Sequence, residues 1–159
     1  MRPTLLVLAA LAFAAPAAAQ PASDRAEVRL EPSTGEIEGL VVLDAPGPLI
    51  VRLAGSLGLL EARTGGRLLP VTRGDGAWTV PATADAPVEL RYAGRMAMGP
   101  DASLPFLGPE GGFLPGGSGW LPEIAGRRVG IELTLDVPEP YAAVATGKLV
   151  EERQEGDRY

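Results

Sequence analysis

Glycine and proline interrupt this chain so often that a long helix cannot form in it. The 159 residues include 21 Gly and 16 Pro, and both are unfavourable in a helix interior. No window sustains the 3.6-residue period of an amphipathic helix. Short runs of alternating apolar and polar residues recur instead at intervals of about 8–12 residues, with turn residues between them. This pattern predicts an all-β fold, an antiparallel two-sheet sandwich.

The clearest strand lies in the stretch from 119 to 150. Apolar side chains alternate along it with polar residues or glycine, which is the period of a strand with one buried face. Pro138 and Pro140 cannot donate to a sheet and end this strand. Residues 142–150 (AAVATGKLV) are typical of a second strand, so we expect 128–150 to form a β-hairpin or corner. The alternating apolar residues are Val129, Ile131, Leu133, Leu135 and Val137.

A second hairpin is predicted over residues 26–43. Val28 and Leu30 alternate with charged residues, and Pro32 and Gly35 supply the turn. Residues 40–43 (LVVL) are apolar on both faces, as in a strand that is covered from both sides. Shorter strands are expected at 49–54, 59–63, 67–72, 77–80 and 88–92.

Residues 94–119 form a long Gly- and Pro-rich loop. A loop of this length in a compact domain is usually functional or disordered, and its apolar content argues against free disorder. We expect it to cover one open end of the sandwich, with one short strand at 112–114; a ligand site is the alternative. Its large apolar residues are Met96, Met98, Leu104, Phe106, Leu107, Phe113 and Leu114.

The N-terminus has the layout of a secretory signal peptide. Arg2 precedes an apolar run, and three alanines precede Gln20, so we expect cleavage after Ala19. The apolar run is shorter than the roughly 20 residues that a membrane anchor needs. The sequence thus predicts export to a bacterial periplasm or beyond, without a stable membrane anchor. The expected segments are a signal peptide (1–19), a disordered leader (20–25), one sandwich domain (26–150) and a charged tail or truncated strand (151–159).

The chain lacks the side chains that most hydrolytic sites use. It contains no His and no Cys, so neither a His-Glu-x-x-His zinc site nor a Ser-His-Asp triad can be built from it. Its carboxylates suit calcium, but they form no Asp-x-Asp-x-Asp loop. The formal net charge of −6 opposes a phosphate backbone. We therefore expect no catalytic residue, no metal, no cofactor and no nucleic-acid partner.

Residues 120–150 also carry a family resemblance. Trp120 and Pro122 precede the alternating strand, and Tyr141 and the sequence VATGKLV follow it. This order resembles the end of the N-terminal β-sandwich domain of aminopeptidase N-like zinc metallopeptidases, the membrane alanyl aminopeptidase family. The resemblance extends at the level of strand order over 26–92 and does not include a catalytic domain. It implies a saddle-like scaffold domain that packs on a thermolysin-like catalytic domain and closes one side of a substrate cavity.

These observations favour an exported, non-catalytic scaffold or protein-binding module whose partner is another protein or a second copy of the chain. One alternative is a truncated fragment of a secreted zinc aminopeptidase whose catalytic domain is missing. A further alternative is a carbohydrate-binding sandwich in which Trp78 and Trp120 stack on a sugar, although tryptophans beside apolar strands more often anchor buried surfaces. Because large apolar patches are rarely left bare, the candidate partner-binding residues are Leu40, Val42, Met96, Met98, Phe106, Phe113 and Trp120.

Overall fold

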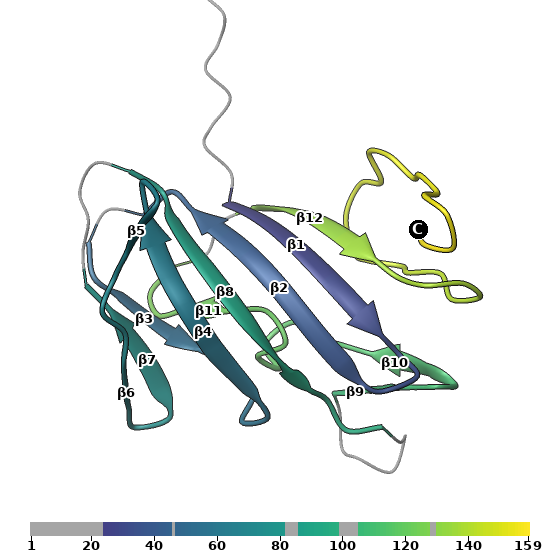
Figure 1. Ribbon diagram of the computed structural model, residues 1–159, viewed down its shortest axis with the longest axis horizontal. Helices are drawn as coiled ribbons and strands as arrows, with labels where there is room; N and C mark the ends of the chain where they lie inside the picture. Colours follow the sequence, from purple (N-terminus) through teal and green to yellow (C-terminus); the bar gives the residue numbers. More distant parts are fainter. Residues whose placement is uncertain (1–23, 46, 82–85, 99–104, 128–129) are drawn as a thin grey trace, which may run out of the picture.

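The computed structural model describes residues 24–45, 47–81, 86–98, 105–127 and 130–159. The regular elements in these ranges are β-strands, arranged in two sheets and a two-stranded hairpin (Figure 1). This arrangement confirms the predicted all-β sandwich. Within the same ranges, no helix is long and apolar enough to cross a membrane. The predicted signal peptide lies outside the described residues, and the first strand begins at Asp24, inside the predicted leader.

The larger sheet has six strands in the order β12-β1-β2-β8-β4-β5. Neighbouring strands are antiparallel except β1 and β12, which run parallel. β1 and β2 form the hairpin expected from the sequence, with Gly35 at a φ of 72° in its turn. The strand bounds are β1 (Asp24–Glu31), β2 (Glu36–Leu43), β4 (Leu57–Thr64), β5 (Arg67–Leu68), β8 (Val88–Arg95) and β12 (Ile131–Asp136).

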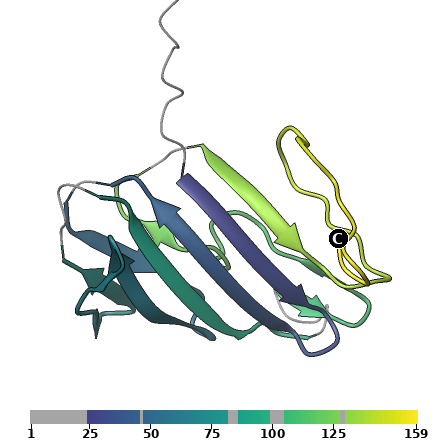
Figure 2. The same ribbon diagram turned by 45° about the horizontal axis from the view of Figure 1, so that its top comes forward.

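Two smaller units cover the inner face of the larger sheet (Figures 1 and 2). One is a four-stranded sheet in the order β11-β3-β7-β6, and the other is the β9–β10 hairpin. Val51 of β3 and Leu107 of β9 belong to the same buried cluster as Val41 and Leu90 of the larger sheet, so the core lies between these layers. The bounds are β3 (Leu49–Arg52), β6 (Thr72–Gly74), β7 (Ala77–Val80), β9 (Phe106–Gly108), β10 (Gly111–Phe113) and β11 (Glu123–Ile124).

Strand β8 forms the centre of the core. Val88, Leu90 and Tyr92 alternate along it and are each 0% exposed, as the alternation predicted. The Tyr92 ring lies across Gly39 of β2, its partner in the sheet. A Cβ added at Gly39 would lie 2.3 Å from two atoms of that ring, so this pairing requires glycine.

A β-bulge in β4 explains why its apolar pattern is irregular. The pairing of β4 with β8 shifts between Leu59 and Glu61. Leu60 therefore points outward and is 65% exposed, whereas Leu59 and Ala62 both face the core. One extra residue thus restores the inward orientation of the second half of the strand.

The C-terminal part of the chain differs from the prediction. Residues 142–150 form no strand, so the expected hairpin or corner over 128–150 is wrong. β12 pairs with β1, and Val137 exchanges two backbone hydrogen bonds of 2.9 Å with Tyr159. The position opposite Val137 is therefore filled by the last residue of the chain. In the charged tail or truncated strand expected over 151–159, residues 151–157 are exposed and Tyr159 pairs with Val137.

The long loop is partly confirmed. β8 continues to Arg95, and the short strand expected at 112–114 is β10, one residue earlier, paired with β9. Met96 and Leu107 are buried against the core at 6% and 3% exposure, which fits the predicted cover. Leu104 lies outside the described residues.

Candidate functional site

The seven candidate residues do not form one surface. Met96 and Trp120, at 6% and 8% exposure, are part of the chain's own core. Leu40 and Val42 lie on the outer face of the larger sheet, because their neighbours Val41 and Leu43 point into the core. Met98, Phe106 and Phe113 lie instead on or beside the β9–β10 hairpin, which belongs to the inner side.

Phe106 and Phe113 form what we call the hairpin patch, and Met98 lies beside β9 with its side chain near Gly35. Phe106 and Phe113 are direct partners in the antiparallel pair β9–β10, and such partners project from the same face. Phe113 is 50% and Met98 49% exposed, and Phe106 is half-buried. The patch is therefore a small apolar surface on a short, two-stranded hairpin.

The support of the hairpin patch is well fixed. The backbone N–H of Leu107 donates a 2.8 Å hydrogen bond to the carbonyl of Ala97, and the Tyr141 hydroxyl donates one of 2.7 Å to the carbonyl of Pro109. A Cβ on Gly108 would lie 2.2 Å from the carbonyl oxygen of Met98. Glycine at this position therefore lets the Met98 segment and β9 approach closely.

The outer face of the larger sheet carries alternating charges around Leu40 and Val42. Leu40 lies between Glu27 and Arg91, and Val42 lies between Arg25 and Glu89. These apolar side chains are half-buried, because long charged side chains can cover apolar surface with their stems. The sequence predicted that this strand is covered on both faces. Among the described residues, neighbouring side chains cover its outer face, and no second sheet does.

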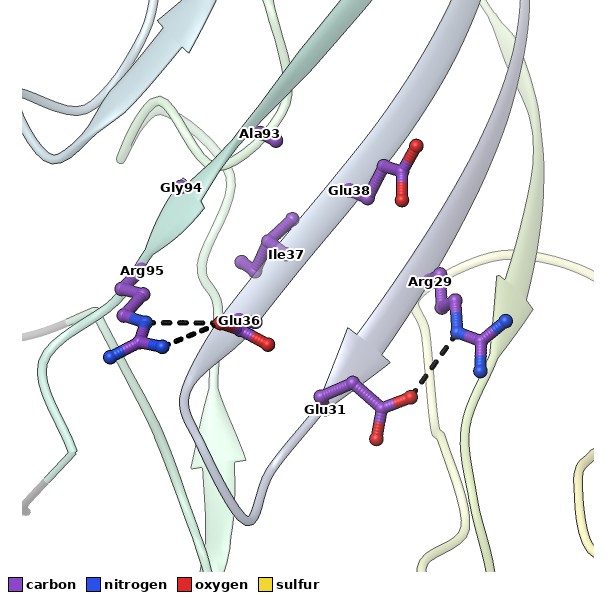
Figure 3. A pocket seen from close by; sticks show the side chains of 8 residues that line it. All are labelled: Arg29, Glu31, Glu36, Ile37, Glu38, Ala93, Gly94 and Arg95. Atoms are coloured by element: carbon purple, nitrogen blue, oxygen red, sulfur yellow. Dashed lines mark hydrogen bonds and ion pairs between the residues drawn. The ribbon is translucent and has the colours of Figure 1, made fainter.

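A shallow depression of about 420 Å³ lies at one end of this outer face (Figure 3). Arg95 donates to Glu36 with a shortest N···O distance of 2.6 Å, and Arg29 donates to Glu31 at 3.2 Å. The hydrogen bond from Arg95 lowers the pKa of the Glu36 carboxyl below its usual value, with a smaller contribution from Thr34. Paired, exposed charges of both signs are typical of a solvated sheet face and supply no reactive group.

The two tryptophans do not present free rings. Trp120 is buried, and the guanidinium of Arg73 lies 5.0 Å from the ring centroid of Trp78, where it covers one face. A sugar-stacking site needs open aromatic faces, so these positions do not support the carbohydrate-binding alternative. The described residues also contain no cluster of three or more acidic side chains able to hold a metal ion.

Two arginines that sequence reasoning missed fix the ends of the described fold. Arg127 donates to both carboxylate oxygens of the buried Asp24, at 2.7 and 3.2 Å, and so fixes the start of β1. Arg158 binds Asp136 and Glu31, the latter at 2.6 Å, and also donates to the carbonyl of Leu30. Its side chain is only 16% exposed. An arginine among acidic residues near the end of a chain gives no sequence signal for such a role.

The fold is similar to part of several solved zinc peptidases. An aminopeptidase N family protein from Idiomarina loihiensis matches 73% of this chain at 18% identity and a TM-score of 0.57, over 22% of its own length. An M1 zinc metallopeptidase from Deinococcus radiodurans matches 86% at 17% identity and a TM-score of 0.59, over 36% of its length. A two-domain M1 zinc metallopeptidase bound to L-arginine also matches 86%, at 17% identity and a TM-score of 0.62.

These comparisons confirm the resemblance at the level of the fold. The chain spans 22% to 37% of the length of these similar structures, so its fold matches one part of each of them. Searches with family profiles and against curated sequences give no match.

Proposed function

We propose that this chain is an exported, non-catalytic β-sandwich that acts as a scaffold or protein-binding module. The proposal is carried by one observation: the fold of part of the aminopeptidase N family occurs in a sequence without His or Cys. The chain has the fold of part of such a peptidase but lacks the imidazoles that hold zinc in a His-Glu-x-x-His site. What remains is a rigid sandwich with surfaces that can contact another protein.

The hairpin patch is the contact surface that fits this proposal best. Phe113 exposes about half of its surface on a support that is itself anchored in the core through Leu107. Exposed aromatic side chains on a fixed backbone can bind a partner with little loss of conformational freedom. Leu40 and Val42 are less suited, because charged side chains flank both of them.

The experiment measures both the absence of catalysis and the presence of a contact surface. We expect the purified chain to bind no stoichiometric zinc, to cleave no aminopeptidase substrate and to bind a hydrophobic fluorescent probe. The double variant Phe106→Ser, Phe113→Ser should reduce probe binding several-fold. Leu60→Ser is the matched control, because Leu60 is equally apolar and 65% exposed but lies on β4. Stoichiometric zinc, peptide cleavage or the same loss in both variants would contradict the proposal.

The same structural likeness favours a second candidate function, namely that of one part of a zinc aminopeptidase whose catalytic part is encoded separately. One of the similar structures is a Deinococcus radiodurans zinc metallopeptidase bound to a Tyr-Ser-Ala substrate. This candidate predicts a neighbouring reading frame with a His-Glu-x-x-His motif. It also predicts that the chain, added to that catalytic part, raises its peptidase activity.

A further inference from the structure

The segment from 142 to 154, which we call the C-terminal loop, exposes several large apolar side chains. Val144, Leu149 and Val150 are 97%, 75% and 86% exposed. No backbone–backbone hydrogen bond joins residues 142–154 to any other part of the described chain. The loop thus combines strand-forming apolar residues with unpaired backbone groups, which is the combination that pairs with another strand.

The base of the C-terminal loop is nevertheless fixed. Val137 and Tyr159 exchange backbone hydrogen bonds, and the N–H of Glu139 donates to the carbonyl of Asp157 at 2.8 Å. Arg158 binds Glu31 and Asp136 just below these contacts. In Figures 1 and 2 the loop extends next to β12 from this base. It is therefore held out from the sheet and is not a loose terminus.

The same base prevents the loop from completing a hairpin with its own β12. In such a hairpin, residues just after the Pro138–Tyr141 turn would pair with Val137 and then with β12. The backbone groups of Val137 already bind Tyr159. The hairpin register on β12 is therefore closed to the loop.

The sequence from 148 to 152 (KLVEE) is complementary to itself when two copies run antiparallel. With Val150 placed opposite its own copy, Lys148 of each chain faces Glu152 of the other, and this ion pair occurs twice. A two-fold axis through this point is the symmetry of most protein dimers. Opposite charges in direct cross-strand positions are favourable, and like charges are unfavourable.

The neighbouring symmetric registers lack this complementarity. Centring the pair on Leu149 places Lys148 opposite Val150, and centring it on Glu151 places two glutamates opposite each other. Lys148, the only lysine of a chain with net charge −6, therefore selects one register. A bend at Thr146 and Gly147 ends the extended run on one side and limits the pairing to this short segment.

We propose that residues 148–152 mediate self-association by pairing with the same residues of a second copy of this chain. The inference rests on the proposed binding function and names one partner for it, on a surface separate from the hairpin patch. A strand pair of this length buries little surface, so the dimer is weak, with a dissociation constant on the order of 100 μM.

Sedimentation equilibrium of the purified chain tests this proposal by charge reversal. Lys148→Glu and Glu152→Lys each place like charges opposite one another twice, and each should weaken dimerisation by about tenfold or more. The double variant Lys148→Glu, Glu152→Lys restores the pairs and should recover the dimer. Within one extended chain these residues are about 13 Å apart, so recovery reports contact between copies.

Two outcomes overturn the proposal, and a further measurement then tests the hairpin patch as the contact surface. A wild-type chain that stays monomeric at about 1 mM, roughly ten times the expected dissociation constant, overturns the proposal. So does a dimer that both single reversals leave unchanged. If that dimer is lost in the Phe106→Ser, Phe113→Ser variant, association occurs through the hairpin patch, and the proposed binding function stands without this inference.

Discussion

Strands β8 and β12 have the same alternation in sequence but very different surroundings. The inward residues of β8 are 0% exposed, and the strand has a partner on each side. In β12, Ile131 is 43% exposed, Leu133 and Leu135 are half-buried, and the strand lies at the edge of its sheet. Alternation therefore identifies a strand with one apolar face, but it does not tell how deeply the strand is buried or which strand pairs with it.

The largest expected effect tests the central position of β8. Gly39→Ala places a Cβ 2.3 Å from the ring of Tyr92, which is fully buried, so we expect a loss of about 3 kcal/mol in the free energy of unfolding. Equilibrium urea denaturation measures this loss. Gly58→Ala on β4 is the control, because its added Cβ has 4.0 Å to the nearest atom, the Ala93 carbonyl oxygen. Equal losses in the two variants would show that packing around Tyr92 is looser than described.

A matched pair of leucine truncations compares the two strands directly. Leu90→Ala in β8 removes a side chain with 0% exposure, and such changes cost about 2–5 kcal/mol. Leu133→Ala in β12 removes a half-buried side chain and should cost less than about 1.5 kcal/mol. Thermal and urea denaturation give both values. Similar losses would mean that β12 belongs to the core as fully as β8 does.

The third prediction concerns the attachment of the C-terminus to β12. Arg158→Ala leaves Glu31 and Asp136 without their shared cation, so the amides of Val137 and Tyr159 should lose most of their protection from hydrogen exchange. We expect a cost of about 1–2 kcal/mol, confined to this region. Arg153→Ala is the control, because its ion pair with Glu155 is exposed on both sides. Unchanged protection in Arg158→Ala would show that the backbone bonds alone hold the terminus.

The smallest expected effect has the opposite sign. Among the described residues the buried Tyr92 hydroxyl has no hydrogen-bond partner, and burial raises the pKa of this hydroxyl above its usual range. Tyr92→Phe removes the unpaired group and keeps the ring, so stability should rise by about 1 kcal/mol. Urea denaturation measures the change. A loss of stability instead would indicate that the hydroxyl binds a group that the described residues do not include.

Local patterns predicted the elements whose partners are close in sequence. The β1–β2 hairpin follows from Pro32 and Gly35 in its turn, and β8 follows from three alternating apolar residues. The bulge at Leu60 was not predictable, because an extra outward residue is chosen by the pairing with β8 and not by its own side chain. The close approach of Tyr92 to Gly39 was not predictable either, because the two residues lie far apart in the sequence.

The candidate site was predicted only in part, for a related reason. Apolar residues in the long loop were recognised, but their sequence does not separate Met96, which is buried, from Met98, which is half exposed. The strand expected at 142–150 has a suitable composition, yet the terminal residues take the position opposite Val137. Competition between two segments for one partner is a property of the whole chain, and no local pattern reports it.

The parallel pairing of β1 with β12 also has a consequence for how the chain folds. Asp24 is placed opposite Ile131, so one edge of the first strand stays open until residues 131–136 have emerged. Contacts this distant in sequence form slowly, since a long stretch of chain must first be closed into a loop. Until then, the nascent molecule offers a bare strand to any other extended chain nearby, and rapid completion of synthesis or a holding chaperone would protect it.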